Sequence, residues 1–267
     1  EAQTPYEWHA ALFARAAERG VTLFSSPFDE TAVDLLDRLG APAFKIASFE
    51  AVDLPLIRYA AAKGKPLIIS TGMASLAEIE TARSAALEAG AAGVVLLHCV
   101  SSYPAELSDA NVRTIADMAR RFDGPVGLSD HTHGTAASVA AVALGASVIE
   151  KHFTLARADG GPDAAFSLEP AEFAALVRDC KDAWSALGTA HYDVLGSERG
   201  SLQFRRSLYV SADVRAGEPL TRANVRSIRP GNGLPPADLE DVLGRPAARD
   251  LKRGEPLASD MIAGSAV

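Results

Sequence analysis

Two histidines, His131 and His152, lie at the ends of two successive apolar runs with strand-like composition, residues 125–129 and 147–152. If these runs are neighbouring parallel strands, both imidazoles face one edge of the sheet about one strand spacing apart. Imidazole suits a borderline divalent cation, and two protein ligands leave open positions for substrate and water. The spacing therefore predicts a metal site. The alternative is a pair of hydrogen-bonded histidines that shape their loops, and we expect nearby His133 to be a loop residue.

Lysines and hydroxyl groups occupy similar positions on other runs. Lys45 and Lys151 could bind an anion or form a Schiff base, although a lysine at a rim can also simply extend into solvent. Hydroxyl groups come from four serines near strand ends, which are Ser26, Ser48, Ser70 and Ser129. A lysine among hydroxyls suits a phosphate or carboxylate group.

Three further residues are candidates for holding a polyhydroxy substrate: Tyr103, Glu150 and Asp163. Tyr103 belongs to a Ser-Ser-Tyr-Pro turn, where it could equally be a packing aromatic. Glu150 could equally orient a metal-bound histidine through a hydrogen bond.

One pattern repeats from residue 21 to residue 186: a short β-rich apolar run, then an amphipathic segment rich in Ala and Leu. The runs are apolar on both faces, which is typical of parallel strands covered by helices. Six strands are predicted, at 22–26, 44–48, 66–71, 94–99, 125–129 and 147–152. Seven helices are predicted, at 5–19, 30–39, 54–63, 76–89, 111–122, 135–144 and 170–187.

The polar residues that end the runs, His98 among them, favour a barrel over an open sheet. A barrel gathers every strand end around one mouth, whereas an open sheet binds at a single switch point. No Gly-x-Gly-x-x-Gly follows a run, which disfavours dinucleotide binding. We therefore predict an α/β fold, a TIM (β/α)8 barrel with about six strands present. The helix at 5–19 would precede the third strand, so we expect the first two strands to be missing.

The character of the chain changes after residue 187. We predict a barrel domain over 1–187, a polar linker over 188–203 and a small β-rich domain over 204–267. Within the last domain, Val-Arg-Ala-Gly-Glu-Pro-Leu at 214–220 recurs as Leu-Lys-Arg-Gly-Glu-Pro-Leu at 251–257. This is a weak internal duplication in a module that is small for an independent core.

The composition excludes several classes of function. A formal net charge of −8 disfavours nucleic-acid binding. No apolar run reaches the roughly 18 residues that would cross a bilayer. Cys99 and Cys180 are isolated from each other and form neither a disulfide framework nor a zinc motif, which indicates reduced thiols in a cytoplasmic protein.

A series of motifs resembles the sialic acid synthase family. They are FSSPFD (24–29), FKIAS (44–48), ISTGM (69–73), HCVSSYPAE (98–106), GLSDHTHG (127–134) and EKHFT (150–154). The C-terminal module, with RRSL (205–208) and RPGNGL (229–234), is similar to the antifreeze-like (SAF) domain of that family. The motifs run in order through nearly the whole chain.

The resemblance implies a transferase that condenses phosphoenolpyruvate with an open-chain acetamido sugar. The enol carbon attacks the sugar aldehyde, water adds to the resulting cation, and phosphate leaves. His131 and His152 then bind the divalent metal, Mn²⁺ or Mg²⁺, and count with Glu150 as catalytic residues. Positions that hold phosphoenolpyruvate are matched by Ser26, Lys45, Ser48, Ser70, Ser101 and Ser129. Positions that hold the sugar are matched by Tyr103, Glu150 and Asp163.

The stretch 156–170 is similar to the branch of the family that uses 2,4-diacetamido-2,4,6-trideoxy-altrose and makes pseudaminic acid. Two features differ from that branch, because Val100 stands where Thr is common and His98 is closer to the neuraminate branch. An N-acetylneuraminate or legionaminate synthase is therefore the alternative.

The resemblance also implies an assembly and a location. Phe204 and Arg229 match residues that reach into the active site of the partner subunit, which implies a domain-exchanged homodimer. The family implies the cytoplasm of a bacterium and a product that decorates a cell-surface glycan or flagellin.

The expected absence of two strands should affect both activity and stability. In the family those strands carry a catalytic Glu, a Lys and a Gln, and an open barrel exposes unpaired strand edges. We therefore expect these 267 residues alone to be unstable or inactive. Two other hypotheses stay open: a Schiff-base aldolase that uses Lys45 or Lys151, and a non-catalytic sugar-binding fragment.

Overall fold

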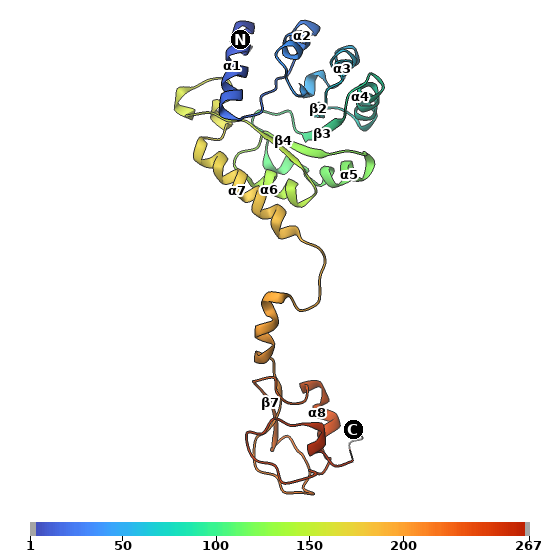
Figure 1. The fold of residues 1–267 in the computed structure, drawn as a ribbon, viewed down its shortest axis with the longest axis vertical. Helices are drawn as coiled ribbons and strands as arrows, with labels where there is room; N and C mark the ends of the chain where they lie inside the picture. Colours follow the sequence, from blue (N-terminus) through green and yellow to red (C-terminus); the bar gives the residue numbers. More distant parts are fainter. Residues whose placement is uncertain (1–3, 265–267) are drawn as a thin grey trace. The chain divides into compact units, whose positions relative to one another are not determined.

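Five parallel strands, paired in the order β1-β2-β3-β4-β5, form a curved sheet that is part of a TIM barrel (Figure 1). Their bounds are β1 Phe44–Ile46, β2 Leu67–Ser70, β3 Val94–Cys99, β4 Val126–Asp130 and β5 Val148–Lys151. The predicted barrel architecture is confirmed. The predicted strand at 22–26 is reduced to one parallel bridge between Ser25 and Phe44. Pro27 follows at once and has no N–H to extend a ladder.

The structure is a computed structural model that describes residues 4–264, and the chain divides into two units after Thr189. Within the described residues, no helix combines the length and the apolar character needed to span a membrane.

Seven helices of the first unit lie along the outside of the sheet (Figure 1); the first two precede β1, and each of the other five follows a strand. They are α1 Tyr6–Arg19, α2 Glu30–Arg38, α3 Leu54–Ala61, α4 Leu76–Glu88, α5 Arg113–Arg121, α6 Ala136–Ala143 and α7 Pro170–Leu187. Side chains fix several of their first turns. Asp29 accepts from the Ala32 N–H at 2.7 Å to begin α2, and Ser75 and Glu78 form a capping box for α4.

Side chains alternate between the two faces of each strand, and this alternation separates the core from the mouth of the barrel. Every second strand residue belongs to the hydrophobic core between sheet and helices: Phe44, Ile46, Leu67, Ile69, Val94, Leu96, Val126 and Leu128. The intervening residues face the concave side of the sheet. A polar side chain at the carboxyl end of a strand therefore reaches the mouth of the barrel only if it belongs to the set that faces the concave side.

The pairing of β4 with β5 sets the level of the two histidines. Ser129 lies opposite Glu150, and Asp130 lies opposite Lys151. His131 and His152 are the next residues, so they leave the sheet side by side. By the same alternation they share the concave face with Ser129 and Glu150.

The second unit is built around a two-stranded antiparallel sheet, β6 Ser207–Val210 with β7 Val225–Ile228. Helical turns complete it: η5 Gly196–Phe204, η6 Pro236–Asp238, α8 Leu239–Val242 and η7 Ser259–Met261. Its core consists of Leu208, Val210, Val214, Leu220, Val225, Val242, Ala247, Leu251, Leu257 and Ile262.

The duplicated sequence of the second unit is also a structural duplication. Val214 and Leu251, the first residues of the two copies, exchange backbone hydrogen bonds of 3.0 and 2.8 Å. In each copy the glutamate accepts from the backbone N–H three residues before it, at 2.9 Å in the first copy and 2.7 Å in the second. Each copy ends in a fully buried leucine, Leu220 or Leu257. The two copies are therefore hydrogen-bonded to one another, and both contribute leucines to the small core of this unit.

Gly127 lies on β4 where the neighbouring strands leave no room for a side chain. A Cβ atom there would lie 2.2 Å from the Val148 carbonyl oxygen and 2.7 Å from the Leu97 side chain. We predict that Gly127→Ala destabilises the barrel unit by ~1–3 kcal/mol, because backbone must move to admit the methyl group. Urea unfolding measures this. Gly93→Ala, where a Cβ meets nothing within 4 Å, is the control and should change stability little. Equal effects of the two substitutions would contradict the prediction.

Candidate active site

The imidazoles of His131 and His152 lie together at the mouth, with ring centroids 5.2 Å apart. Tyr103 packs on His131 at a centroid distance of 4.3 Å, and Phe166 packs on His152 at 5.0 Å. Backbone bonds hold both histidines, since the His131 carbonyl accepts from the Ala105 N–H and the His152 carbonyl accepts from the Leu168 N–H. The two rings are thus fixed by residues from loops on either side.

Hydrogen bonds set the tautomer of at least one ring. His131 Nδ1 lies 2.9 Å from the Val100 carbonyl oxygen, which can only accept, so Nδ1 carries the hydrogen and Nε2 keeps its lone pair. His152 Nδ1 lies 3.5 Å from Asp163 Oδ2, and this carboxylate favours a hydrogen on the same nitrogen. Both Nε2 atoms then remain available to a ligand.

The pKa values of the two rings move in opposite directions. For His131, burial lowers the pKa, but the contacts with the Cys99 thiol and the Val100 carbonyl outweigh it and the pKa rises above its usual value. For His152, burial and the neighbouring His131 lower the pKa despite Asp163 and Glu150. His152 is therefore the ring more readily held neutral, while a cation at His131 must compete with a proton.

A second cluster at the mouth is centred on Lys45, which is 7% exposed. Its Nζ donates to Ser70 Oγ at 2.8 Å and lies 3.5 Å from Glu150 Oε2. Glu150 accepts from Ser129 Oγ at 2.6 Å. Four of the predicted residues, drawn from four strands, therefore form one connected group around a buried cation.

Three more side chains, those of Ser48, Cys99 and Ser101, form a cluster next to His131. Ser48 donates to the Cys99 sulfur at 3.3 Å, and that sulfur lies 3.7 Å from both Ser101 Oγ and His131 Nδ1. Gly72 permits this crowding, because a Cβ there would lie 2.5 Å from Ser48 Cβ and from Ser101 Oγ. Cys99 was not among the predicted site residues. Its position at the end of β3, on the same face as Leu97, is the signal that could have identified it.

Arg157 organises the loop that carries Asp163. Its guanidinium binds Glu172 through two nitrogens, at 2.5 and 3.0 Å, and also donates to the Ser167 carbonyl at 3.1 Å. Its backbone N–H donates to Glu169. The loop between β5 and α7 is thereby attached to the first turn of α7. Sequence reasoning did not identify Arg157, since a single arginine in a loop carries no spacing signal.

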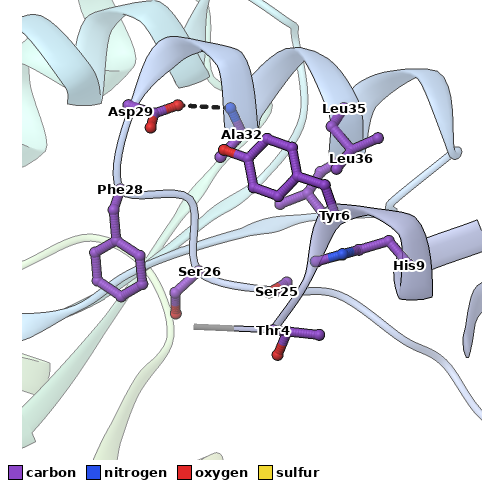
Figure 2. A pocket seen from close by; sticks show the side chains of 10 residues that line it. All are labelled: Thr4, Tyr6, His9, Ser25, Ser26, Phe28, Asp29, Ala32, Leu35 and Leu36. Carbon is purple, nitrogen blue, oxygen red and sulfur yellow. Dashed lines mark hydrogen bonds between the residues drawn. The ribbon is translucent and has the colours of Figure 1, made fainter. Parts of the chain in front are cut away.

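Three predicted residues lie outside this group. Ser26 lines a separate cavity of about 440 Å³ between α1, residues 25–29 and α2, together with Tyr6, His9 and Phe28 (Figure 2). Phe204 and Arg229 belong to the second unit, where Phe204 ends η5 and is 58% exposed and Arg229 directly follows β7.

Two expectations are corrected by the alternation of side chains along the strands. His98 shares the face of Leu96, and its Nε2–H donates to the Ala110 carbonyl at 2.8 Å, so it faces the helices instead of the mouth. Lys151 also faces the helices. Its side chain is 1% exposed and lies 2.9 Å from Asp130 Oδ2, which fits neither a rim lysine nor a Schiff-base lysine. His133 is exposed, as expected of a loop residue.

Within residues 4–264 no three or more His, Cys, Asp or Glu side chains converge as a metal site would require. Among the described residues, these two imidazoles are therefore the candidate ligands of a cation at the mouth, and two protein ligands leave positions open for substrate and water.

Known proteins share both units. The NeuB family pattern matches residues 1–192, and the SAF domain pattern matches residues 205–263. The chain is 42% identical over 256 residues to pseudaminic acid synthase of Campylobacter jejuni, covering 96% of this chain and 75% of that protein. It is 39% identical over 250 residues to N,N'-diacetyllegionaminic acid synthase of the same species, covering 92% and 75%. The crystal structure of an N-acetylneuraminic acid synthetase from Leptospira borgpetersenii, in complex with citrate, superposes with a TM-score of 0.71 at 35% identity, covering 75% of this chain and 70% of that one.

The bond between Arg157 and Glu172 gives a pH-dependent prediction. Hydrogen bonding to Arg157 lowers the pKa of Glu172 from its usual 4.5 to about 2. A carboxyl whose pKa falls on folding stabilises the folded state above its unfolded pKa, and that contribution disappears as the pH drops through the folded pKa. We predict that Arg157→Met returns the pKa of Glu172 towards 4.5 and removes the loss of stability between pH 4.5 and about 2 that this group causes.

NMR titration of the Glu172 carboxyl carbon, with thermal unfolding at each pH, measures both effects. Arg178→Met is the control, because Arg178 bonds only to the neighbouring Asp179 among the described residues. An unchanged Glu172 titration in Arg157→Met would refute the assignment.

Proposed function

The chain belongs to the NeuB family, as the sequence resemblance predicted, and from this premise we propose that it is a pseudaminic acid synthase. The proposed reaction joins phosphoenolpyruvate, 2,4-diacetamido-2,4,6-trideoxy-altrose and water to give pseudaminic acid and phosphate. The observation that carries the proposal is one mouth that combines two histidines with free Nε2 atoms and a buried lysine among hydroxyls.

The lysine cluster supports the assignment of phosphoenolpyruvate. This substrate carries a carboxylate and a phosphate, and the Lys45 ammonium with the hydroxyls of Ser70 and Ser129 offers charge-assisted hydrogen bonds to such groups. We propose that Ser48 and Ser101 extend this set toward the histidines. Because Lys45 is buried, its attraction for an anion is screened less than that of a surface lysine.

The two histidines fit a shared divalent cation, Mn²⁺ or Mg²⁺. Each leaves Nε2 free and is held through Nδ1, by a backbone carbonyl or a carboxylate, which is the usual arrangement of metal-binding histidines. Two imidazoles that share a cation through bonds of about 2.1 Å have ring centres about 5 Å apart, and the observed distance is 5.2 Å. When bound, such a cation would supply Lewis-acid polarisation of the sugar aldehyde.

The chain's own residues then orient the two substrates. Lys45 and its hydroxyl neighbours hold phosphoenolpyruvate so that its enol carbon faces the aldehyde, which makes the addition effectively unimolecular. Tyr103, Glu150 and Asp163 contact the hydroxyl and acetamido groups of the sugar. The 3.5 Å distance between Glu150 Oε2 and Lys45 Nζ supports a position for Glu150 between the two proposed substrates.

The choice of sugar rests on the segment 156–170. This segment contains Asp163 beside His152, and it resembles the pseudaminic acid branch. The legionaminic acid synthase of similar identity remains the alternative. We also propose a domain-exchanged homodimer, in which Phe204 and Arg229 enter the partner's mouth, and a cytoplasmic location, both on the strength of the family resemblance.

A turnover assay tests the proposed function. For the full-length enzyme we predict phosphate release from phosphoenolpyruvate with the altrose derivative and Mn²⁺ or Mg²⁺, loss of release with a chelator, and no inactivation by borohydride with pyruvate. N-acetylmannosamine is the control sugar and should give little release. Equal use of both sugars would refute the substrate assignment, and borohydride trapping at Lys45 would favour the aldolase hypothesis.

A substitution of Lys45 tests the anion site. We predict that Lys45→Met lowers kcat/KM for phosphoenolpyruvate roughly 10–100-fold, since a hydrogen bond to a charged group contributes about 1.5–3 kcal/mol. The KM for the sugar should change less. Lys63→Met, which breaks a 2.7 Å ion pair with Asp34 away from the mouth, is the matched control and should leave both values near those of the wild type. A loss confined to the sugar KM would contradict the assignment.

A further inference from the structure

We propose that the buried ion pair of Asp130 and Lys151 is a positioning device that holds His131 and His152 in the orientation in which they share a cation. Each member of the pair directly precedes one of the histidines in the chain. The inference rests on the proposed function, because it gives the pair a role in the proposed metal site. Asp130 and Lys151 are positioning residues and do not contact substrate.

The pair is buried on the face of the sheet opposite to the mouth. Asp130 and Lys151 are register partners across β4 and β5, their side chains are each 1% exposed, and Lys151 Nζ lies 2.9 Å from Asp130 Oδ2. Because neighbouring residues of a strand point to opposite faces, the histidines that follow turn toward the mouth while the pair points to the helix layer. The ion pair thus connects the two strands immediately behind the two imidazoles.

Three of the side-chain hydrogen bonds of the pair converge on Thr132, the residue after His131. Asp130 Oδ1 accepts from the Thr132 N–H at 2.9 Å and from Thr132 Oγ1 at 2.8 Å, and Lys151 Nζ donates to the Thr132 carbonyl at 2.5 Å. Asp130 Oδ2 accepts from Ser138 Oγ on α6 at 2.6 Å. His131 therefore lies between Asp130 and Thr132, whose polar groups are held by hydrogen bonds. These bonds restrict the backbone of His131 and with it the direction in which the imidazole points.

Stability alone does not account for such a pair. Desolvation of two charges offsets much of their attraction, and replacement of a buried ion pair by apolar residues is often neutral or stabilising. An apolar pair could not form directional hydrogen bonds that hold the backbone in one conformation. The four bonds to the Asp130 carboxylate and the bond from Lys151 to Thr132 specify one conformation at the end of β4 and tie it to β5.

Three variants separate positioning from folding: Asp130→Asn, Lys151→Met and the double variant. Asn keeps an acceptor for Thr132, and Met keeps the length of the lysine without its charge. Lys151→Met leaves a buried carboxylate without its cation, so its Tm should fall by roughly 10 °C. The double variant contains no buried charge at this position, and its Tm should return to within about 3 °C of the wild type.

The decisive readouts are Mn²⁺ affinity, by electron paramagnetic resonance, and the ¹⁵N shifts of the two imidazoles without metal. For the double variant we expect Mn²⁺ affinity to stay about 10–100-fold weaker than in the wild type, as when groups that orient metal-binding histidines are lost. We also expect the His131 ring to exchange between tautomers where the wild type shows one. Recovery of both properties together with Tm would overturn the positioning role.

A matched pair elsewhere provides the control. Asp37 and Lys65 form a 2.6 Å ion pair with partly exposed side chains, and the double variant Asp37→Asn, Lys65→Met should change neither Mn²⁺ affinity nor the imidazole shifts. If the wild type binds no Mn²⁺, the proposed metal role fails. The imidazole shifts then still decide the inference, because unchanged tautomers in the Asp130, Lys151 double variant would overturn it.

Discussion

The alternation of side chains along β4 and β5 is the constraint on which the whole site depends. Because Ser129 pairs with Glu150 and Asp130 pairs with Lys151, each strand contributes one polar residue to each face at the same level. The concave face then receives Ser129, Glu150 and the two histidines, whereas the helix face receives the ion pair. A shift of one residue in either strand would exchange these sets and bury the imidazoles among the helices.

Much of this arrangement could be predicted from sequence. Strand and helix order follow from apolar runs alternating with amphipathic segments, and the polar residues that end the runs indicate a barrel. The direction of each side chain was harder to predict, because parallel strands are apolar on both faces and show no visible period of two. His98 and Lys151 were misjudged for this reason. The core residues Leu96 and Leu128, once identified, determine the face of every other residue in their strands.

Contacts that depend on the conformation of loops could not be predicted from the sequence pattern. Arg157 and Glu172 are fifteen residues apart and meet only because the loop after β5 folds back onto the start of α7. Gly72 leaves room for Ser48 and Ser101, whose hydroxyls lie near the Cys99 sulfur, and this space is a property of the packing. The weak duplication in the second unit was visible in the sequence, but its consequence, that the copies pair with one another, requires the backbone.

The charges explain how an acidic chain can offer a site for an anion. With a formal net charge of −8, the protein as a whole repels phosphate and carboxylate groups. At the mouth, however, the local balance is set by burial. Asp130 neutralises Lys151 on the far side of the sheet, whereas the ion pair of Lys45 among the described residues is with the more distant and partly exposed Glu150. The lysine behind the sheet is closely paired, with 2.9 Å between Lys151 Nζ and its carboxylate, which suits the positioning role proposed for it. The lysine in front of the sheet is more loosely paired, with 3.5 Å between Lys45 Nζ and its carboxylate, and the weaker attraction suits the anion-binding role proposed for it.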